Sequence, residues 1–280
     1  MARLDQVKVS VCELPDNLSL RHPAWRDILR RIESDRPDIA LLNEMPLGPW
    51  IASEATFSND LATATIAAHE SGLLALRKVS TAVISSRPVQ GRYKLANEAF
   101  LLSDSAYQAI HHKQYFPQET GFFEERWFVP GQPGFDVAEY RGVRIGVLLG
   151  AELTFTEWAR HYREQGAHLI VSPRASGPFR RHRHIAARMA AIASGCYVLS
   201  SNRVSGGTDS RPRFDGRGFV YSPTGELLGE TSASEPFLCV NIELDLVTKA
   251  QRHYSSGARE AHALEVHRRR ELANPLARSQ

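Results

Sequence analysis

Residues 144–173 read RIGVLLGAELTFTEWARHYREQGAHLIVSP, and this stretch contains the pattern that predicts the fold. The apolar run Arg144–Leu149 predicts a buried strand. Phe155–Gln165 predicts a helix, because its aromatic and small apolar residues recur at helical spacing. A second strand is predicted at His168–Pro173. Short apolar runs that alternate with amphipathic stretches in this way indicate a layered α/β fold.

The same alternation continues in both directions from this stretch. Further strands are predicted at Val7–Cys12, Asp38–Leu42, Ser80–Ser86, Lys94–Leu102, Ala106–His111, Cys196–Ser201, Phe219–Tyr221, Leu227–Leu228 and Leu238–Ile242. Further helices are predicted at Pro23–Asp35, Asn59–Ser71 and His184–Ser194, whereas residues 112–142 are rich in proline and glycine and predict loops. The number of strands fits two sheets. We therefore expect one α/β domain over residues 1–250, followed by a polar, interface-forming tail over residues 251–280.

Composition and charge narrow the class of protein. The chain has 280 residues, of which 42% are hydrophobic and 23% are charged, so it can bury a sizeable core. The formal net charge of +3 is too small to indicate nucleic-acid binding. Arginines cluster at Arg180, Arg181 and Arg183 and again at Arg268–Arg270. These clusters fit a solvated surface, and the first one also fits a rim that attracts an anionic substrate.

The cysteines and the absence of long apolar runs predict the location. Cys12, Cys196 and Cys239 each lie in an apolar, strand-like run, which is typical of reduced core thiols. The N-terminus has no apolar run like that of a signal peptide, and no stretch approaches the length of a membrane span. We therefore expect a cytoplasmic protein without a membrane partner.

Motifs for cofactors and metals are missing from the sequence. No glycine-rich, phosphate-binding loop follows a predicted strand, so a nucleotide cofactor is not expected. His69-Glu70 lacks a second histidine four residues further on. His182 and His184 form a bare pair without the additional ligands that zinc requires. We expect neither a cofactor nor a metal ion.

Three polar residues lie at predicted strand ends or in the loop-rich region, where active sites are commonly built. Glu44 follows the buried run Ile39–Leu42, and its position fits either a capping residue or a reacting base. Lys113 leaves a strand and would be a surface lysine if it were considered alone. Glu124 lies among aromatic residues, which would raise its pKa if it is buried.

The segments around these residues resemble those of the nitrilase superfamily, in particular its aliphatic amidase and N-carbamoyl-amine amidohydrolase branches. The resemblance is carried by Asp38–Pro46 (general base), His112–Gly131 (lysine and second glutamate), Ile145–Glu152 (nucleophile), Gly166–Arg174, Ser201–Arg203 and Ser222–Gly225. Together with the strands between them, these segments extend the similarity over nearly the whole chain, from about Val7 to Ile242.

The resemblance implies a four-layer α-β-β-α sandwich and a hydrolase for the non-peptide C–N bond of a small amide or carbamoyl substrate. In that chemistry a thiol attacks the carbonyl carbon, a glutamate accepts and returns its proton, and a lysine stabilises the oxyanion. By resemblance these roles fall on Glu44 (base), Lys113 (oxyanion) and Glu124 (orientation of the lysine and the substrate). The backbone N–H of Ala151 would be a second oxyanion donor. The family's pairing through helices also implies a homodimer or a larger homo-oligomer.

The sequence departs from the family at the nucleophile. Gly150 stands where the family has its cysteine, and the next two residues are altered to Ala151 and Glu152. Glycine has no side chain, so it supplies neither a nucleophile nor a proton. Three explanations remain open: an engineered knock-out of an active hydrolase, a natural pseudoenzyme that binds a ligand or partner, or a mechanism in which Glu44 activates water. In each case we expect slow turnover or none by the thiol route.

The substrate's other groups are left open by the resemblance. Arg174 follows a predicted strand and fits either a salt-bridged surface arginine or a clamp for a carboxylate. A clamp would favour N-carbamoyl amino acids, because guanidinium binds carboxylate in a bidentate manner. Phe122, Trp127 and Glu152 are further candidates for the substrate-binding wall, although aromatic residues in such a loop also pack without touching a ligand.

Overall fold

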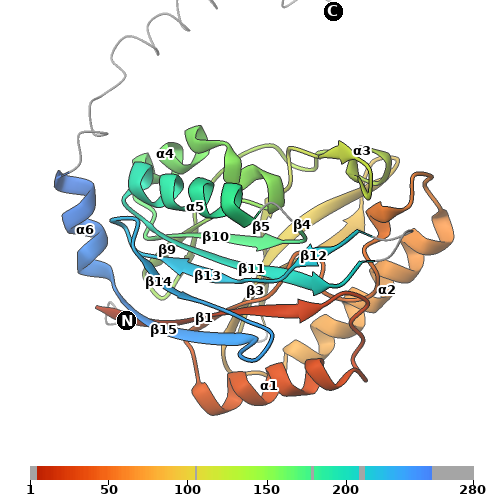
Figure 1. Cartoon of the computed structure of the whole chain (residues 1–280), viewed down its shortest axis with the longest axis horizontal. Coiled ribbons are helices and arrows are strands. Elements are labelled where there is room, and N and C mark those ends of the chain that lie inside the picture. Colours follow the sequence, from red (N-terminus) through yellow and green to blue (C-terminus); the bar gives the residue numbers. More distant parts are fainter. Residues whose placement is uncertain (1–4, 105, 178–179, 208–211, 254–280) are drawn as a thin grey trace, which may run out of the picture.

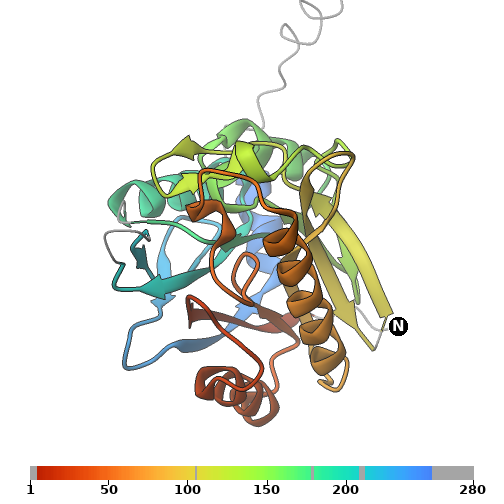
Figure 2. The same cartoon turned by 90° about the vertical axis from the view of Figure 1, so that its right-hand side faces the viewer.

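The computed structural model describes residues 5–104, 106–177, 180–207 and 212–253, apart from the side chains of Arg180 and His253. Strands occupy the middle of the molecule, and helices cover its two outer sides (Figure 1). Helices α4 (Thr156–Glu164) and α5 (Arg180–Ser194) lie on one side, and α1 (Pro23–Asp35) and α2 (Asn59–Leu76) lie on the other. In the turned view of Figure 2, α1 lies at the bottom and the green segment that contains α4 lies at the top.

The strands alternate with helices along the chain. In chain order they are β1 (Gln6–Pro15), β2 (Ile39–Leu41), β3 (Ala82–Gln90), β4 (Leu95–Ser103), β5 (Ala106–His112), β6 (Gln118–Glu119), β7 (Phe122–Phe123), β8 (Ala138–Tyr140), β9 (Val143–Val147), β10 (Leu169–Arg174), β11 (Tyr197–Ser205), β12 (Phe214–Asp215), β13 (Phe219–Tyr221), β14 (Leu227–Glu230) and β15 (Phe237–Glu243). The remaining helices are η1 (Ile51–Ser53), α3 (Glu124–Trp127), η2 (Gly150–Thr154) and α6 (Leu244–His253).

Hydrogen bonds connect most of the strands into one path in the order β5-β4-β3-β2-β1-β11-β10-β9-β8. The first part of β1 pairs with β2, as in Val9–Val11 with Ile39–Leu41, and its last residues pair with β11. β1 therefore connects the two halves of the path. β15 adds to β1, β12 and β13 add to β11, and β6 and β7 form a separate hairpin.

Packing of the apolar side chains defines the layers. Val9, Ile84 and Ile145, together with other buried residues of both halves, form one cluster between the two groups of strands. A second cluster joins α1 and α2 to one outer face, and a third joins α4 and α5 to the other. The order of the layers is therefore helix, sheet, sheet, helix, as predicted from the resemblance.

Parallel pairing brings several chain segments to one edge of the sheets. β2 and β11 each pair in parallel with β1. β10 pairs in parallel with β11 on one side and with β9 on the other. Loops that follow parallel strands meet at the carboxyl ends of those strands, which is where α/β folds commonly bind ligands. Glu44 follows β2, Gly150 follows β9, and Arg174 ends β10.

Several predicted boundaries differ from the structure. The helix predicted at Asn59–Ser71 continues to Leu76, and the one predicted at His184–Ser194 begins at Arg180. Residues 112–142, predicted to be loops, contain the hairpin of β6 and β7, the helix α3 and the strand β8. Proline and glycine mark the turns correctly there, but the short runs between them are anchored by aromatic packing, which their spacing does not indicate.

The described ranges contain no helix that is both long enough and apolar enough to cross a membrane. α6 continues through residue 250 to His253, so the predicted domain boundary falls inside a helix. The rest of the tail, including Arg268–Arg270, lies outside the described residues. The boundary and the interface role of the tail stay predictions.

Candidate active site

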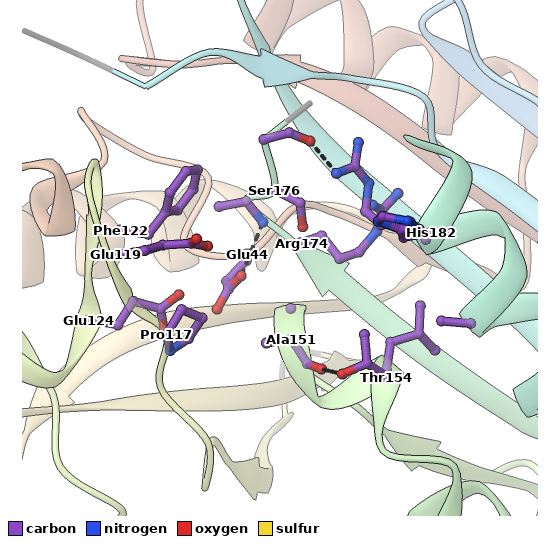
Figure 3. Close-up of a pocket in the computed structure, with 16 residues that line it drawn as sticks. Glu44, Pro117, Glu119, Phe122, Glu124, Ala151, Thr154, Arg174, Ser176 and His182 are labelled. Carbon is purple, nitrogen blue, oxygen red and sulfur yellow. Dashed lines mark hydrogen bonds between the residues drawn. The ribbon is translucent and has the colours of Figure 1, made fainter. Parts of the chain in front are cut away.

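A cavity of about 240 Å³ opens at the strand ends described above. Figure 3 shows that its walls come from the end of β2, the β6–β7 hairpin, η2, the end of β10 and the first turns of α5. Its lining residues are Glu44, Pro117, Glu119, Phe122, Glu124, Gly150, Ala151, Leu153, Thr154, Arg174, Ala175, Ser176, Gly177, His182, Arg183 and Ala186. A space of this size suits a small molecule, since clefts for drug-sized ligands usually enclose about 300–1,000 Å³.

Lys113 lies directly behind this cavity and is fully buried. Its backbone N–H continues the β5 pairing by donating to the carbonyl of Asn97 at 2.9 Å. Its ammonium Nζ donates to Glu44 Oε1 at 2.7 Å and to Glu124 Oε2 at 2.7 Å. The structure thus brings together the three residues that the sequence predicted to form a site, from three separate segments of the chain.

Glu44 is held in place through both carboxylate oxygens. Oε1 accepts from Asn97 Nδ2 at 2.8 Å as well as from Lys113, and Oε2 accepts from the backbone N–H of Ala175 at 3.0 Å. Asn97 was not among the predicted site residues, and it lies in β4 beside Glu98 and among apolar residues. An amide buried in the middle of such a strand is a signal that could have identified it, because buried polar groups need a partner.

Arg203 fixes the backbone that carries Glu44. The Arg203 side chain is buried and donates to the carbonyls of Glu44, Met45 and Gly48, while its partner in an ion pair is Asp16. Met45 has a φ of +42°, in the left-handed region that costs a residue with a side chain about 1–2 kcal/mol. Tertiary contacts of this kind are needed to hold a backbone conformation that is unfavourable by itself.

The electrostatics of the cluster follow from its composition of two carboxylates and one ammonium. Burial raises the pKa of Glu124 to about 8, with Lys113 opposing this shift and Glu44 adding to it. Burial alone would lower the pKa of Lys113, but the carboxylates of Glu124 and Glu44 raise it above its usual value. The lysine therefore stays charged, and one of the two carboxyl groups takes up a proton more readily than an exposed glutamate does.

Gly150 begins η2 immediately beside this cluster, with a φ of +54°. A Cβ atom at this position would lie 2.8 Å from Glu44 Oε2 and 2.9 Å from Lys113 Nζ. A side chain of residue 150 would thus start against both the carboxylate and the ammonium. Ala151 also lines the cavity and is the second residue of η2, where the backbone N–H groups of the first turn have no partner inside the helix.

The thiols of the chain lie elsewhere. Cys12 is fully buried on β1, where its Sγ contacts the Leu41 carbonyl at 3.4 Å, and burial raises its pKa to about 12. Cys196 is also buried, and burial raises its pKa to about 11. Cys239 lies on β15. None of the described cysteines is among the residues that line the cavity.

Arg174 reaches the cavity wall, but its guanidinium is engaged by its own chain. Nε donates to Ser200 Oγ, Nη2 donates to the Arg217 carbonyl at 3.1 Å, and the group lies 4.8 Å from the centre of the Phe219 ring. Burial lowers its pKa well below the usual value. Nη1 is buried without a hydrogen-bond partner. These contacts direct the guanidinium toward β11, the Arg217 carbonyl and the Phe219 ring. They do not favour the predicted role of Arg174 as a clamp for a substrate carboxylate.

The other predicted wall residues are divided between the cavity and the core. Phe122 lines the cavity. Trp127 is fully buried behind it, donates from Nε1 to the Glu54 carbonyl at 2.7 Å and packs on Phe57. Glu152 is also fully buried and does not line the cavity. A residue next to a site in sequence thus faces away from it when the turn between them rotates the side chain.

The Glu152 carboxylate joins the segments that carry Lys113 and Gly150. Its Oε2 lies 2.8 Å from His111 Nε2 and accepts from the backbone N–H of Leu149 at 2.8 Å, and its Oε1 accepts from the N–H of Gln114 at 2.6 Å.

Within the described ranges, no group of three or more His, Cys, Asp or Glu residues is arranged to hold a metal ion. The expectation that no cofactor is needed stays a prediction.

Comparison with known families gives one match that covers most of the chain. The model of the family described as "Carbon-nitrogen hydrolase" matches residues 44–252. This range includes every residue that lines the cavity.

Curated relatives are more distant. The N-carbamoylputrescine amidase of Arabidopsis thaliana is 28% identical over 171 residues, which are 56% of this chain and 57% of that protein. The citrullinase of Francisella tularensis is 26% identical over 146 residues, 49% of this chain and 51% of that protein. The match thus spans little more than half the length of these relatives.

Solved structures resemble the whole fold. A carbon-nitrogen hydrolase from Helicobacter pylori G27 superimposes with a TM-score of 0.80 at 20% identity and covers 98% of this chain and 100% of that one. An amidase from Nesterenkonia sp. gives a TM-score of 0.75 at 20% identity, with 96% and 97% covered. At this identity the likeness establishes the fold alone.

Proposed function

Because this chain belongs to the carbon–nitrogen hydrolase family, we propose that its cavity binds the amide or carbamoyl group of a small molecule and that Glu44, Lys113 and Glu124 are the residues that act on its C–N bond. One observation carries the proposal. A buried ammonium lies 2.7 Å from each of two carboxylates that line one cavity. Such a cluster is expensive to bury, so a functional role is the favoured explanation.

The proposed roles follow from the hydrogen bonds. Glu44 accepts and returns a proton, since Oε2 faces Gly150 while Oε1 is held by Asn97 and Lys113. Lys113 uses two of its three N–H groups on carboxylates, which leaves the third for the developing oxyanion of the substrate. The N–H of Ala151 adds a second donor. Glu124 orients Lys113 and, when protonated, donates to the substrate.

Gly150 limits this chemistry. A thiol at position 150 would form a thioester with the substrate, and glycine offers no atom for that bond. We therefore propose that the thioester route is closed in this chain. Loss of a covalent nucleophile costs enzymes on the order of 10⁴-fold or more in rate.

Restoring the thiol tests the proposal. Gly150→Cys is expected to release ammonia from at least one of N-carbamoylputrescine, L-citrulline and acetamide on the order of 10⁴-fold faster than the natural chain. The left-handed backbone costs the new side chain about 1–2 kcal/mol, and its Cβ displaces only the flexible ends of the Glu44 and Lys113 side chains, so the variant should still fold. Gly150→Ala is the matched control, because it adds the Cβ without the thiol. A folded Cys variant that is no faster than the Ala variant on any of these compounds would show that the hydrolase proposal is wrong.

A second candidate is hydrolysis by water without a covalent intermediate. The observation that favours it is the approach of Glu44 Oε2 and Lys113 Nζ to the space in front of Gly150. Water would give a proton to Glu44 while its oxygen bonds to the carbonyl carbon, and Lys113 would stabilise the oxyanion. Glu44 would then return the proton to the nitrogen as the C–N bond breaks, which leaves an acid and an amine.

Glu44→Gln in the chain with Gly150 separates this candidate from a silent binding protein. If the natural chain releases ammonia slowly, the water route requires that Glu44→Gln abolish the release, while Glu125→Gln on the neighbouring surface leaves it unchanged. Activity that survives Glu44→Gln contradicts the water route. Binding of the same compounds without any release by the natural chain supports the silent binding protein.

We also propose that the chain pairs with a second copy through α4 and α5. Ile185 and Met189 on α5 are 51% and 45% exposed, which is unusual for large apolar side chains that stay in water. Sedimentation of the natural chain and of the double variant Ile185→Lys, Met189→Lys would test this. A monomer for the natural chain would contradict it.

A further inference from the structure

The hairpin of β6 and β7 forms one wall of the cavity and ends directly before Glu124. Its register pairs Glu119 with Phe122 and Gln118 with Phe123. Residues opposite each other on antiparallel strands share one face of the hairpin. Gly121, with a φ of +81°, allows the tight turn between the two strands, and the Glu124 N–H closes the hairpin on the Pro117 carbonyl at 3.0 Å.

Phe122 fixes which face of this hairpin points inward. Its ring packs 6.5 Å from the centre of Trp50 and 5.8 Å from the centre of Phe214, in the cluster beneath the cavity. Glu119 shares the face of Phe122, and both residues line the cavity. Figure 3 shows the Glu119 carboxylate beside the Phe122 ring, on the side of the cavity where Glu44 lies.

The charge of Glu119 is not balanced by the chain. No ion pair joins it to any cation in the part of the chain that the structure describes. The two guanidinium groups that line the cavity are directed to other groups of the chain, although Nη1 of Arg174 has no hydrogen-bond partner. Arg183 donates to the Gly177 carbonyl and pairs with Asp215 at 3.2 Å, and Arg174 is held by Ser200 and by the Arg217 carbonyl.

The cluster of Glu44, Lys113 and Glu124 does not offset this negative charge. Glu44, Lys113 and Glu124 together carry one negative charge when all are ionised, and none when Glu124 is protonated. His182 on the opposite wall already has an interaction of its own. The wall that Glu119 shares with Glu44 and Glu124 is therefore neutral to acidic, and Glu119 is its exposed carboxylate.

We infer that Glu119 determines specificity by binding a positively charged group, such as an ammonium, at the end of the substrate remote from the C–N bond. The inference rests on the proposed function, which places the amide or carbamoyl group at Lys113. The substrate class is then small amides or ureas that carry a cation. Substrates that carry a carboxylate at this end are disfavoured, contrary to the clamp that the sequence suggested for Arg174.

Three ureas of matched length test the inference with the chain as it stands, whose lack of a thiol at position 150 allows equilibrium binding to be measured by calorimetry. N-carbamoylputrescine carries an ammonium, butylurea carries no charge, and γ-ureidobutyrate carries a carboxylate. The cationic urea is expected to bind about 5-fold more tightly than butylurea, and the anionic urea about 5-fold more weakly, because one solvent-accessible ion pair contributes up to about 1 kcal/mol. Added salt should reduce both differences.

Substitution of Glu119 identifies the group responsible. Glu119→Gln is expected to remove the preference for the cationic urea, and Glu119→Lys to reverse it, while binding of butylurea stays within about 2-fold. Glu125→Gln removes a neighbouring exposed carboxylate outside this cavity and should leave all three affinities unchanged. Circular dichroism would verify that each variant folds.

The outcomes separate this inference from the proposed function. Binding of all three ureas with no preference for charge, or a preference that Glu119→Gln leaves intact, overturns the role of Glu119 and leaves the proposed function standing. Failure of all three ureas to bind to the folded chain overturns the role of Glu119, and the Gly150→Cys assay, which also includes the amide acetamide, then decides the proposed function separately.

Discussion

Two fully buried glutamates, Glu44 after β2 and Glu152 in η2, lie on opposite sides of the Lys113 segment and look alike by local criteria. Each accepts from a backbone N–H through one oxygen and from a side chain or a second N–H through the other. Only Glu44 lines the cavity and contacts Lys113. Glu152 faces His111 and the strand end behind the cavity.

The comparison teaches that burial and hydrogen bonding do not distinguish a reacting carboxylate from a supporting one. Access to the cavity and proximity to the ammonium do distinguish them. Oε2 of Glu44 lies beside the position of residue 150, although it also accepts from the Ala175 N–H, whereas both oxygens of Glu152 accept from groups that do not line the cavity. This contrast supports the proposed role of Glu44 in proton transfer, and we propose that Glu152 positions the Lys113 and Gly150 segments.

The largest expected difference between the two glutamates is in catalysis. In the Gly150→Cys background, Glu44→Gln should lower kcat by about 10²–10⁴-fold, because a general base is lost. Glu152→Gln should lower kcat by about 10-fold or less, because it disturbs only the position of reacting groups. Initial rates of ammonia release would measure both. Equal losses in the two variants would contradict the assignment.

The next effect is on stability, where the order of the two glutamates reverses. Two backbone N–H groups donate to different oxygens of Glu152, and the amide of Glu152→Gln would place its NH₂ against one of them. We expect this variant to lose about 2–3 kcal/mol of unfolding free energy. Urea denaturation would measure it. Glu44→Gln should lose less, because removal of one carboxylate also relieves repulsion from Glu124; a greater loss for Glu44→Gln would refute this reasoning.

A third effect is a dependence of stability on pH that originates at Glu124. Its pKa is raised to about 8 in the folded chain, so between the ordinary glutamate pKa and that value the folded state binds a proton that the unfolded state does not. Its contribution to stability is therefore present at low pH and is lost as the pH rises through about 8.

Comparison of the natural chain with Glu124→Gln isolates this contribution from other titrating groups. Urea denaturation from about pH 5 to about pH 8 should show a steeper fall in unfolding free energy for the natural chain than for the variant. Parallel curves would show that the pKa of Glu124 is not raised. A steeper fall for the variant would show that its pKa is lowered.

Much of the site could be predicted because the sequence shows where buried strands end. The apolar run before Glu44 and the run before Gly150 predict buried strands, and parallel pairing brings their ends together. Side-chain direction just beyond a strand could not be predicted. Glu152 lies two residues after Gly150, and the short helix η2 turns it away from the cavity.

The loop-rich region shows the same limit. Trp127 and Phe122 are similar aromatic residues in one predicted loop, but α3 buries the first and the hairpin of β6 and β7 exposes the second to the cavity. Glu119 was missed because it lies in a polar run with no apolar periodicity. Its role depends on pairing with Phe122, which a pattern of single residues does not reveal.

Gly150 also determines how sensitive the cavity is to oxidation and alkylation. Enzymes that depend on a thiolate are inactivated by peroxides and by alkylating agents, which attack the sulfur. The described residues that line this cavity include no sulfur atom, and burial keeps Cys12 and Cys196 protonated. Oxidants and alkylating agents that inactivate thiol-dependent hydrolases therefore have no sulfur atom to attack among the described residues that line this cavity. Its ability to hold a ligand should be the same under oxidative stress as in a reducing cell.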